Sequence, residues 1–309
     1  MKSQLIRGSL WVLLAAGLPL TSTLSHAEAR CPANVSTLHP RLVAESLLVI
    51  PVKINQAGPF DFMVDTGSQP NIIDPSLAAS LELKSQGPVG LVTASTLLQG
   101  SVATVTSLEA GGYTLKNPAV VVEDLGALQA ADPRIRGVLG ENFLAHFDVL
   151  IDYSHLILCL DRSKSLQGEL HGDRIPLVSP KHPEDELPFL NRLVVSVSLS
   201  DSGDRDVLLQ LDSGSTGPVL YSGNKKLERL LRKARLQGPN VDEVHRAFAV
   251  LPPQDIRIGN RNVRKVPFVT PASAAANVPD REEDGILATV LFERVYINHS
   301  GRYVIFDPK

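Results

Sequence analysis

The segment from Phe62 to Asn71 reads FMVDTGSQPN, and it decides the fold. An apolar strand runs into Asp65, and Thr-Gly-Ser follows at once. Alone, this pattern is typical of a strand that ends in a turn, because Asp, Gly and Ser are common turn residues. A second copy, LLQLDSGSTG, places Asp212 after another apolar strand, 212 − 65 = 147 residues further on. The recurrence indicates that the two carboxylates have a shared role.

The similarity between the two halves extends well beyond these two loops. Each aspartate ends a strand–turn–strand unit, SLLVIPVKINQAGPFDFMVD in the first half and RLVVSVSLSDSGDRDVLLQLD in the second. Downstream, the tetrapeptide GVLG that starts at Gly137 matches GILA starting at Gly285, and LEAGGYTLKNPAVVV matches IRIGNRNVRKVPFVT. A repeat that occurs only twice predicts a duplicated domain rather than a solenoid.

Composition suits a globular protein of two domains. The chain has 309 residues, of which 43% are hydrophobic and 20% charged, enough for two domains of about 130 residues each. Short β-rich runs separated by Gly, Pro, Asn and Asp predict an all-β fold. Two helices are expected, a short one in PSLAASLELKS from Pro75 and a longer amphipathic one in GNKKLERLLRKARLQG from Gly223.

The N-terminus predicts export. Residues 1–27 contain two basic residues, an apolar run from Leu10 to about Leu20 and a small-residue exit ending at Ala27, which is the layout of a secretory signal peptide. The apolar run is shorter than the about 20 residues of a membrane span, and no later segment predicts one. We therefore expect a periplasmic or extracellular protein with a formal mature charge of 28 − 33 = −5, which gives no support for nucleic acid as a partner.

Two cysteines, Cys31 and Cys159, leave two interpretations open. In an oxidising compartment they could form a disulfide that ties the mature N-terminus to a strand of the first half. Alternatively, Cys159 is a small buried hydrophobic residue and Cys31 is a free thiol.

The pair DTGS and DSGS, each after an apolar strand and followed downstream by VLG or ILA, resembles the signature of pepsin-like and retropepsin-like aspartic proteases. The resemblance implies an all-β, bilobal acid-protease-like fold: two homologous β-barrel-like lobes about a pseudo-two-fold axis, with a few short helices. The implied lobes are residues 28–165 and 191–309, joined by a connection at 166–190. Two unequal copies in one chain favour a monomer with both aspartates in a single cleft.

The resemblance also implies roles for particular residues. Asp65 and Asp212 would be catalytic, and no cofactor or metal would be required. Thr66 and Ser213 would hydrogen-bond between the loops, whereas the hydroxyls of Ser68 and Ser215 would bind the outer carboxylate oxygens. The remaining implied support residues are the loop glycines and the two apolar-apolar-Gly elements, namely Gly67, Gly214, Val138, Leu139, Gly140, Ile286, Leu287 and Ala288.

These residues predict an exported aspartic endopeptidase that acts on extended peptides. The alternative is a non-catalytic module that binds a peptide or protein in the same cleft. Two departures from the family pattern favour the alternative: Ala288 replaces a glycine, and the expected flap hairpin, with its tip at Gln99–Gly100, has no tyrosine. A third D-S-G at Asp201 matches the position of a hairpin turn and is interpreted as such. No His-x-x-x-His or Cys-x-x-Cys spacing occurs, which disfavours zinc.

Overall fold

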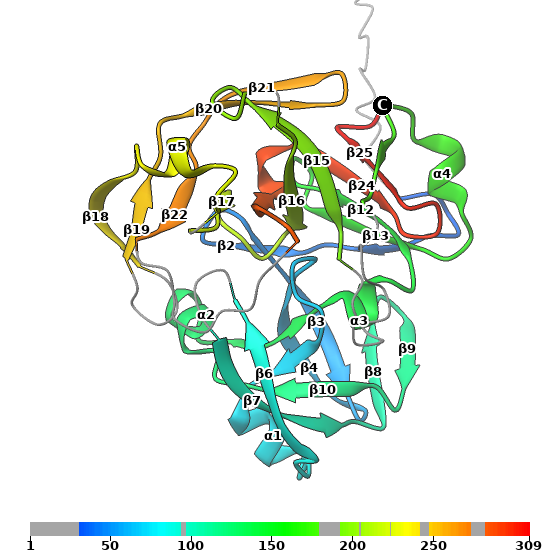
Figure 1. The fold of residues 1–309 in the computed structure, drawn as a ribbon. Helices are drawn as coiled ribbons and strands as arrows, with labels where there is room; N and C mark the ends of the chain where they lie inside the picture. Colours follow the sequence, from blue (N-terminus) through cyan, green and yellow to red (C-terminus); the bar gives the residue numbers. More distant parts are fainter. Residues whose placement is uncertain are drawn as a thin grey trace, which may run out of the picture.

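The computed structural model describes residues 31–93, 97–178, 192–203, 205–222, 224–241, 247–272 and 282–309. The predicted signal peptide, residues 1–27, lies outside this part of the chain, as does the second half of the predicted connection between the lobes. Within it, strands form three sheets of ten, nine and six strands. Figure 1 shows the ten-stranded sheet in the lower half of the molecule and the nine-stranded sheet in the upper half.

The ten-stranded sheet belongs to the first half of the chain. Its order is β6-β7-β10-β5-β11-β4-β3-β8-β9, with β2 paired to β3. The bounds are β2 Arg41–Val43, β3 Leu47–Ile54, β4 Ala57–Val64, β5 Asn71–Ile73, β6 Gly87–Val92, β7 Leu97–Thr104, β8 Ser107–Ala110, β9 Tyr113–Lys116, β10 Ala119–Val122 and β11 Ile135–Leu139.

The nine-stranded sheet repeats this order strand for strand, as β18-β19-β22-β17-β23-β16-β15-β20-β21. The bounds are β15 Val194–Leu199, β16 Val207–Asp212, β17 Val219–Leu220, β18 Arg235–Val241, β19 Ala247–Val250, β20 Gln254–Ile258, β21 Arg261–Val266, β22 Val269–Pro271 and β23 Gly285–Ala288. The duplication deduced from the sequence is therefore a duplication of topology, and the all-β expectation is confirmed.

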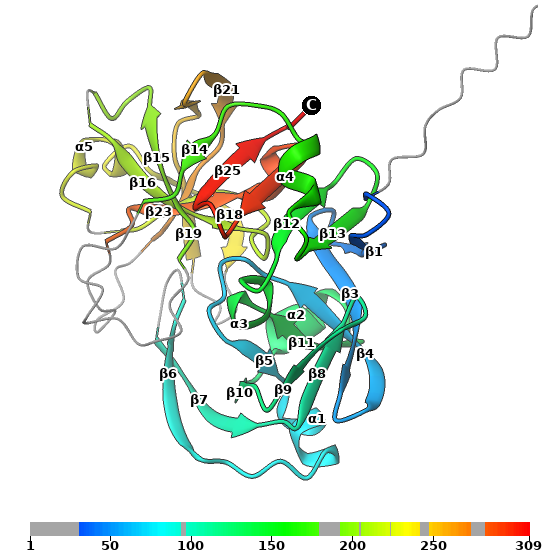
Figure 2. The same ribbon diagram turned by 90° about the vertical axis from the view of Figure 1, so that its right-hand side faces the viewer.

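The six-stranded sheet is built from both halves, in the order β1-β13-β12-β24-β25-β14. At its centre β12 and β24 pair antiparallel, so that equivalent strands of the two halves meet. In Figure 2, β25, β12 and β13 lie above the ten-stranded sheet. The bounds are β1 Ser36–Leu38, β12 Asp148–Asp152, β13 Ile157–Asp161, β14 Ile175–Pro176, β24 Arg294–Asn298 and β25 Tyr303–Phe306. β14 lies inside the predicted connection, so this segment also forms an edge strand.

Helices are few and short. They are α1 Pro75–Ser80, α2 Gly126–Ala131, α3 Glu141–Leu144, α4 Ser165–Glu169, α5 Glu228–Leu231 and a 3-10 turn at Thr289–Leu291. The expected helix α1 forms, capped by the Asp74 carboxylate, which accepts hydrogen bonds from Ser76 N and Leu77 N.

The longer helix predicted from Gly223 is wrong. Only the single turn α5 is helical, and the chain continues into β18 at Arg235. The pairing of β18 with β19 explains the difference, since tertiary contacts override a local helical pattern. Leu227 and Leu230 are still buried, as the periodicity of the apolar residues predicted.

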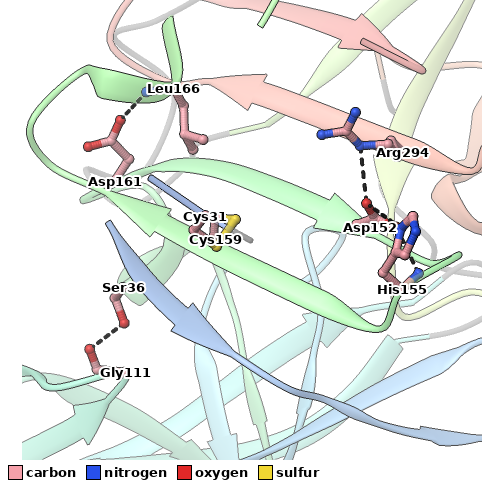
Figure 3. The surroundings of a disulfide bond; sticks show 9 residues. All are labelled: Cys31, Ser36, Gly111, Asp152, His155, Cys159, Asp161, Leu166 and Arg294. Atoms are coloured by element: carbon pink, nitrogen blue, oxygen red, sulfur yellow. Dashed lines mark hydrogen bonds and ion pairs between the residues drawn. A yellow bond between two sulfur atoms is a disulfide. The ribbon is translucent and has the colours of Figure 1, made fainter. Parts of the chain in front are cut away.

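Cys31 and Cys159 form a disulfide, which selects between the two interpretations of these cysteines. The bond ties the chain just before β1 to β13, and β1 itself pairs with β13 through Thr37 and Cys159. Figure 3 shows the bond beside the hydrogen bond from Ser36 Oγ to Gly111 O, 2.6 Å long, which links this segment to the first lobe. The N-terminal segment is thereby fixed to both the six-stranded sheet and the ten-stranded sheet.

Candidate active site

The two aspartates occupy equivalent places at the carboxyl ends of β4 and β16. Parallel strands β11 and β23 flank them, with Leu139 aligned to Val64 and Ala288 aligned to Asp212. In each loop the glycine two residues on donates its N–H to the carboxylate. Gly67 N lies 2.7 Å from Asp65 Oδ1, and Gly214 N lies 2.7 Å from Asp212 Oδ1. The loops therefore hold both carboxylates by equivalent backbone hydrogen bonds.

Each loop glycine lies against the aspartate of the opposite lobe. A Cβ built on Gly67 would lie 2.5 Å from Asp212 Cγ, and one built on Gly214 would lie 2.5 Å from Asp65 Cγ. Carbon atoms cannot approach so closely, so glycine is required at both positions for the loops to meet. The requirement is steric, arising from close approach of the opposite carboxyl group, and not from a left-handed backbone.

Thr66 and Ser213 join the two loops, as the resemblance implied. Thr66 N donates to Ser213 Oγ at 3.1 Å, and Ser213 N donates to Thr66 Oγ1 at 3.0 Å. Their hydroxyls donate in turn to backbone carbonyls across the interface, Thr66 Oγ1 to Leu211 O and Ser213 Oγ to Val64 O. All four hydrogen bonds are buried, so they align the aspartates with little exchange with solvent.

The expected role of the Ser68 and Ser215 hydroxyls is wrong. Ser68 Oγ donates to Pro70 O at 2.8 Å, and Ser215 Oγ donates to Gly217 O at 2.6 Å. The backbone supplies the contact with the carboxylate instead, because Ser68 N lies 3.1 Å from Asp65 Oδ1. Serine hydroxyls in turns commonly bond to neighbouring backbone groups, and each of these two hydroxyls bonds to the carbonyl two residues on.

The two apolar-apolar-Gly elements support the loops differently. Val138, Leu139, Ile286 and Leu287 are buried, as expected for strands that pack behind the aspartates. A Cβ on Gly140 would lie 2.3 Å from Pro70 O, because the Asp65 loop crosses this position. Ala288, its counterpart, is fully buried and is accommodated. Its methyl group therefore fits in the second lobe, whereas a methyl group on Gly140 in the first lobe would collide with the backbone.

The electrostatics of the site follow from burial and from the proximity of the two carboxyl groups. Burial raises the pKa of Asp65 above its ordinary value, and the hydrogen bond from Gly67 N partly offsets this. Burial raises the pKa of Asp212 well above its ordinary value, and the charge of Asp65 raises it further. Two adjacent carboxylates cannot both ionise cheaply, so the pair retains one proton, and its titration belongs to the pair.

A hairpin forms where the flap was expected, but its tip is elsewhere. β6 and β7 pair antiparallel as far as Val92 and Leu97, beyond which residues 94–96 lie outside the described part of the chain. Gln99 and Gly100 lie within β7, and the prediction of a tip there is wrong. Tyr113, outside this hairpin, packs against Phe147 with ring centroids 4.6 Å apart and the rings tilted by 50°, and has a structural role.

The nine-stranded sheet carries an equivalent hairpin, because β18 and β19 occupy the positions of β6 and β7. The sequence did not predict this hairpin, because the helical spacing of apolar residues from Gly223 indicated a helix. The repeated strand order therefore gives both lobes a hairpin at the end of the sheet, whereas the sequence predicted one flap.

Several residues near the dyad were not predicted from the sequence. Gln210 Nε2 donates to Gly67 O at 2.9 Å and so links β16 to the opposite loop. Gln210 was detectable in the sequence as a polar amide side chain in an otherwise apolar strand. Tyr153 and Thr289 share a hydrogen bond of 2.7 Å, and Glu141 pairs with His299 at 3.0 Å. Glu141 was detectable as a charge in the apolar segment VLGENFL.

A metal site and a membrane-spanning helix are both absent from the described part of the chain. Its residues contain no group of three or more His, Cys, Asp or Glu side chains placed to hold a metal ion. The helices described there are all too short to cross a bilayer. The third D-S-G is a turn after β15, where Asp201 forms an ion pair with Lys233 at 2.8 Å.

Paired lobes, each presenting an aspartate in a D-[ST]-G-S loop to the other, are the arrangement that the resemblance to aspartic proteases implied. Comparison with known proteins agrees: residues 50–143 match the family model described as aspartyl protease. The matched segment contains the Asp65 loop and the first support element, and the match supports an aspartic-type endopeptidase, a hydrolase.

Among solved structures, a retropepsin-like aspartic protease from Rickettsia conorii matches with 23% identity and a TM-score of 0.31. The match covers 40% of this chain and 87% of that one. No curated protein matches.

Proposed function

We propose that the chain is an exported aspartic endopeptidase that hydrolyses peptide bonds with a water molecule activated between Asp65 and Asp212. The observation that carries this proposal is the crossed approach of the two loops, in which each glycine lies against the opposite carboxyl group. Such an approach places two carboxyl groups side by side, which is costly unless they share a proton. The dyad of aspartic proteases is the established example of two carboxyl groups that share one proton.

In this mechanism the ionised carboxylate removes a proton from the bound water, and the resulting hydroxide attacks the peptide carbonyl carbon. The protonated carboxyl group donates its proton to the carbonyl oxygen, which gives a neutral tetrahedral intermediate. The carboxyl group that took the proton from water then donates it to the leaving nitrogen, and the C–N bond breaks as one hydroxyl of the intermediate returns its proton to the other carboxylate. The backbone donors Gly67 N and Gly214 N hold the carboxylates throughout, so little reorganisation is needed.

The proposed substrate is a peptide in extended conformation. Two hairpins, β6–β7 and β18–β19, stand at equivalent edges of the sheets, and a strand-like substrate can form main-chain hydrogen bonds with such edges. One chain contributes both aspartates, so a monomer suffices for activity.

Export is part of the proposal. The signal-like sequence of residues 1–27 motivates it, and the Cys31–Cys159 disulfide is consistent with an oxidising compartment such as the periplasm or the exterior. Fractionation of expressing cells, with mass spectrometry of the mature N-terminus, tests it. A mature chain beginning at Glu28 is expected, whereas an intact Met1 terminus in the cytosolic fraction would contradict export.

A non-catalytic peptide-binding module is the second candidate, favoured by the flap hairpin without a tyrosine. The decisive experiment compares wild type with Asp65→Asn and Asp212→Asn on a diverse peptide library from acidic to neutral pH. Cleavage by wild type and its loss in both variants are expected. Asp201→Asn is the matched control, since it alters the same D-S-G tripeptide at an exposed turn. Binding without cleavage by wild type would favour the module.

A further inference from the structure

Two side-chain contacts link the halves of the molecule close to the dyad, and they occupy equivalent positions in the two halves. Glu141 and Thr289 each follow the last residue of a support element, Gly140 and Ala288. Glu141 Oε2 lies 3.0 Å from His299 Nε2, and Thr289 Oγ1 lies 2.7 Å from Tyr153 Oη. Each half therefore contributes one residue to each contact.

The partners of these residues are equivalent as well. Tyr153 directly follows β12 and His299 directly follows β24, the two strands that pair at the centre of the six-stranded sheet. The two contacts thus repeat one arrangement. Each joins the residue after a support element of one half to the residue after the central strand, β12 or β24, of the other half.

The chemistry of the two contacts nevertheless differs. Thr289 and Tyr153 are two hydroxyl groups, and burial raises the pKa of Tyr153 so that it stays neutral. Glu141 and His299 are an acid and a base, with side chains 0% and 8% exposed. The residue after the first support element therefore forms a buried ionisable pair, whereas the residue after the second forms a neutral hydrogen bond.

The Glu141–His299 pair is connected to Asp65 by a backbone hydrogen bond to the Asp65 loop and by electrostatic interaction. Glu141 N donates to Ser68 O at 2.9 Å, within the Asp65 loop. Charged groups near Glu141 include His299, Asp65 and Arg302, and those near His299 include Glu141 and Asp148. The charge of Asp65 raises the pKa of Glu141, so the carboxylate of the ion pair is electrostatically coupled to the dyad.

We propose that Glu141 and His299 are positioning residues that make the dyad electrically asymmetric, with the Glu141 carboxylate keeping the shared proton bound to higher pH. The proposal rests on the proposed function, because it assigns a role relative to Asp65 and Asp212. A like charge near a carboxyl group disfavours its ionisation. The neutral Tyr153–Thr289 contact carries no charge and has no such effect.

The ion pair is self-consistent in the folded protein. Burial by itself would lower the pKa of His299, but the Glu141 carboxylate raises it above its ordinary value. Burial raises the pKa of Glu141, and the charge of His299 partly offsets this. Removing either member therefore removes the ionisation of the other, since an unpaired buried charge is costly.

The test is the pH dependence of kcat/KM for a cleaved peptide in wild type and in Glu141→Gln, which keeps the shape of the side chain. The alkaline limb is expected to move to lower pH by about half a unit or more, because the neighbouring negative charge is gone. His299→Gln should move the limb in the same direction. The double variant should shift no further than either single variant, because the two residues act as one unit.

Tyr153→Phe is the matched control at the equivalent contact. It removes one buried hydrogen bond and is expected to reduce stability, yet to leave the position of the alkaline limb unchanged. If Glu141→Gln and Tyr153→Phe both leave the limb in place, the Glu141 pair has only a structural role, and the proposal is overturned.

A second measurement tests the Glu141–His299 ion pair without relying on catalysis. Titration of His299 by NMR, assigned by comparison with His299→Gln, should give a pKa above the ordinary value in wild type and below it in Glu141→Gln. An unchanged His299 pKa in Glu141→Gln would overturn the ion pair itself. Failure of the proposed function looks different: Asp65→Asn would still cleave peptides, while the His299 titration would remain as expected.

Discussion

Thr66 and Ser213 exchange backbone-to-hydroxyl hydrogen bonds across the interface of the two lobes, at 3.1 and 3.0 Å. Both residues are buried, with 0% and 1% exposure. Their positions within the D-[ST]-G-S loops couple the contact between lobes directly to the alignment of Asp65 and Asp212.

Thr66→Val is expected to destabilise the protein by about 1–3 kcal/mol, because Ser213 N and Leu211 O lose a partner in a buried site. Activity should fall as well, since the loops lose their alignment. Urea denaturation and peptide cleavage measure the two effects. Thr114→Val, at an exposed site in β9, is the control and should change neither; equal behaviour of the two variants would contradict the assigned role.

Gly67→Ala and Gly214→Ala are each expected to abolish cleavage, because the added methyl group would lie 2.5 Å from the carboxyl carbon of the opposite aspartate. Initial rates at a saturating peptide concentration measure the loss. Gly217→Ala is the comparison, since a Cβ there meets nothing within 4 Å. Retained activity in Gly67→Ala would mean that the loops do not approach each other as described.

Ala288→Gly tests whether the second support element is impaired in the natural sequence. Because the methyl group of Ala288 is fully buried and fits, its removal is expected to cost roughly 0.5–1 kcal/mol and not to increase activity. The reciprocal change, Gly140→Ala, should be far more damaging, since its Cβ would lie 2.3 Å from Pro70 O. Thermal unfolding measures the stability of both variants, and peptide cleavage measures their activity. A more active Ala288→Gly would show that the alanine limits catalysis.

Asp212→Asn is expected to be more stable than wild type at pH 7. The pKa of Asp212 is raised in the folded protein, so the folded state binds more protons than the unfolded state above about pH 4, and stability falls as pH rises. Asn cannot ionise and escapes this loss, which is about 1.4 kcal/mol per unit of pKa displacement. The difference in melting temperature should shrink as pH falls towards about 4. A difference that does not depend on pH would contradict the raised pKa.

Cys31→Ala is expected to lower the free energy of unfolding by about 2–4 kcal/mol, because the disulfide closes a long loop of the unfolded chain. Cys159→Ala should cost at least as much, since Cys159 is buried within β13. Denaturation with and without reductant measures the effect. Mass spectrometry of the non-reduced protein checks the bond directly, and two alkylatable thiols would rule it out.

Local pattern alone was sufficient for the duplicated strand–loop units, the positions of Asp65 and Asp212, and the hairpin at Asp201. Each of these depends on residues close together in the chain. The same reasoning failed at residues 223–238, where a helical period gave one short turn, α5, followed by strand β18. Pairing of β18 with β19 overrode the local preference there.

The sequence by itself determined the class of fold and the two aspartates, because a repeated apolar strand ending in D-[ST]-G-S has few structural interpretations. The tertiary structure decided which groups meet. It placed Gly67 against Asp212, turned the hydroxyls of Ser68 and Ser215 away from the carboxylates, and paired Glu141 with His299 across 158 residues. Such contacts depend on how the two lobes pack against each other, and no local pattern encodes that geometry.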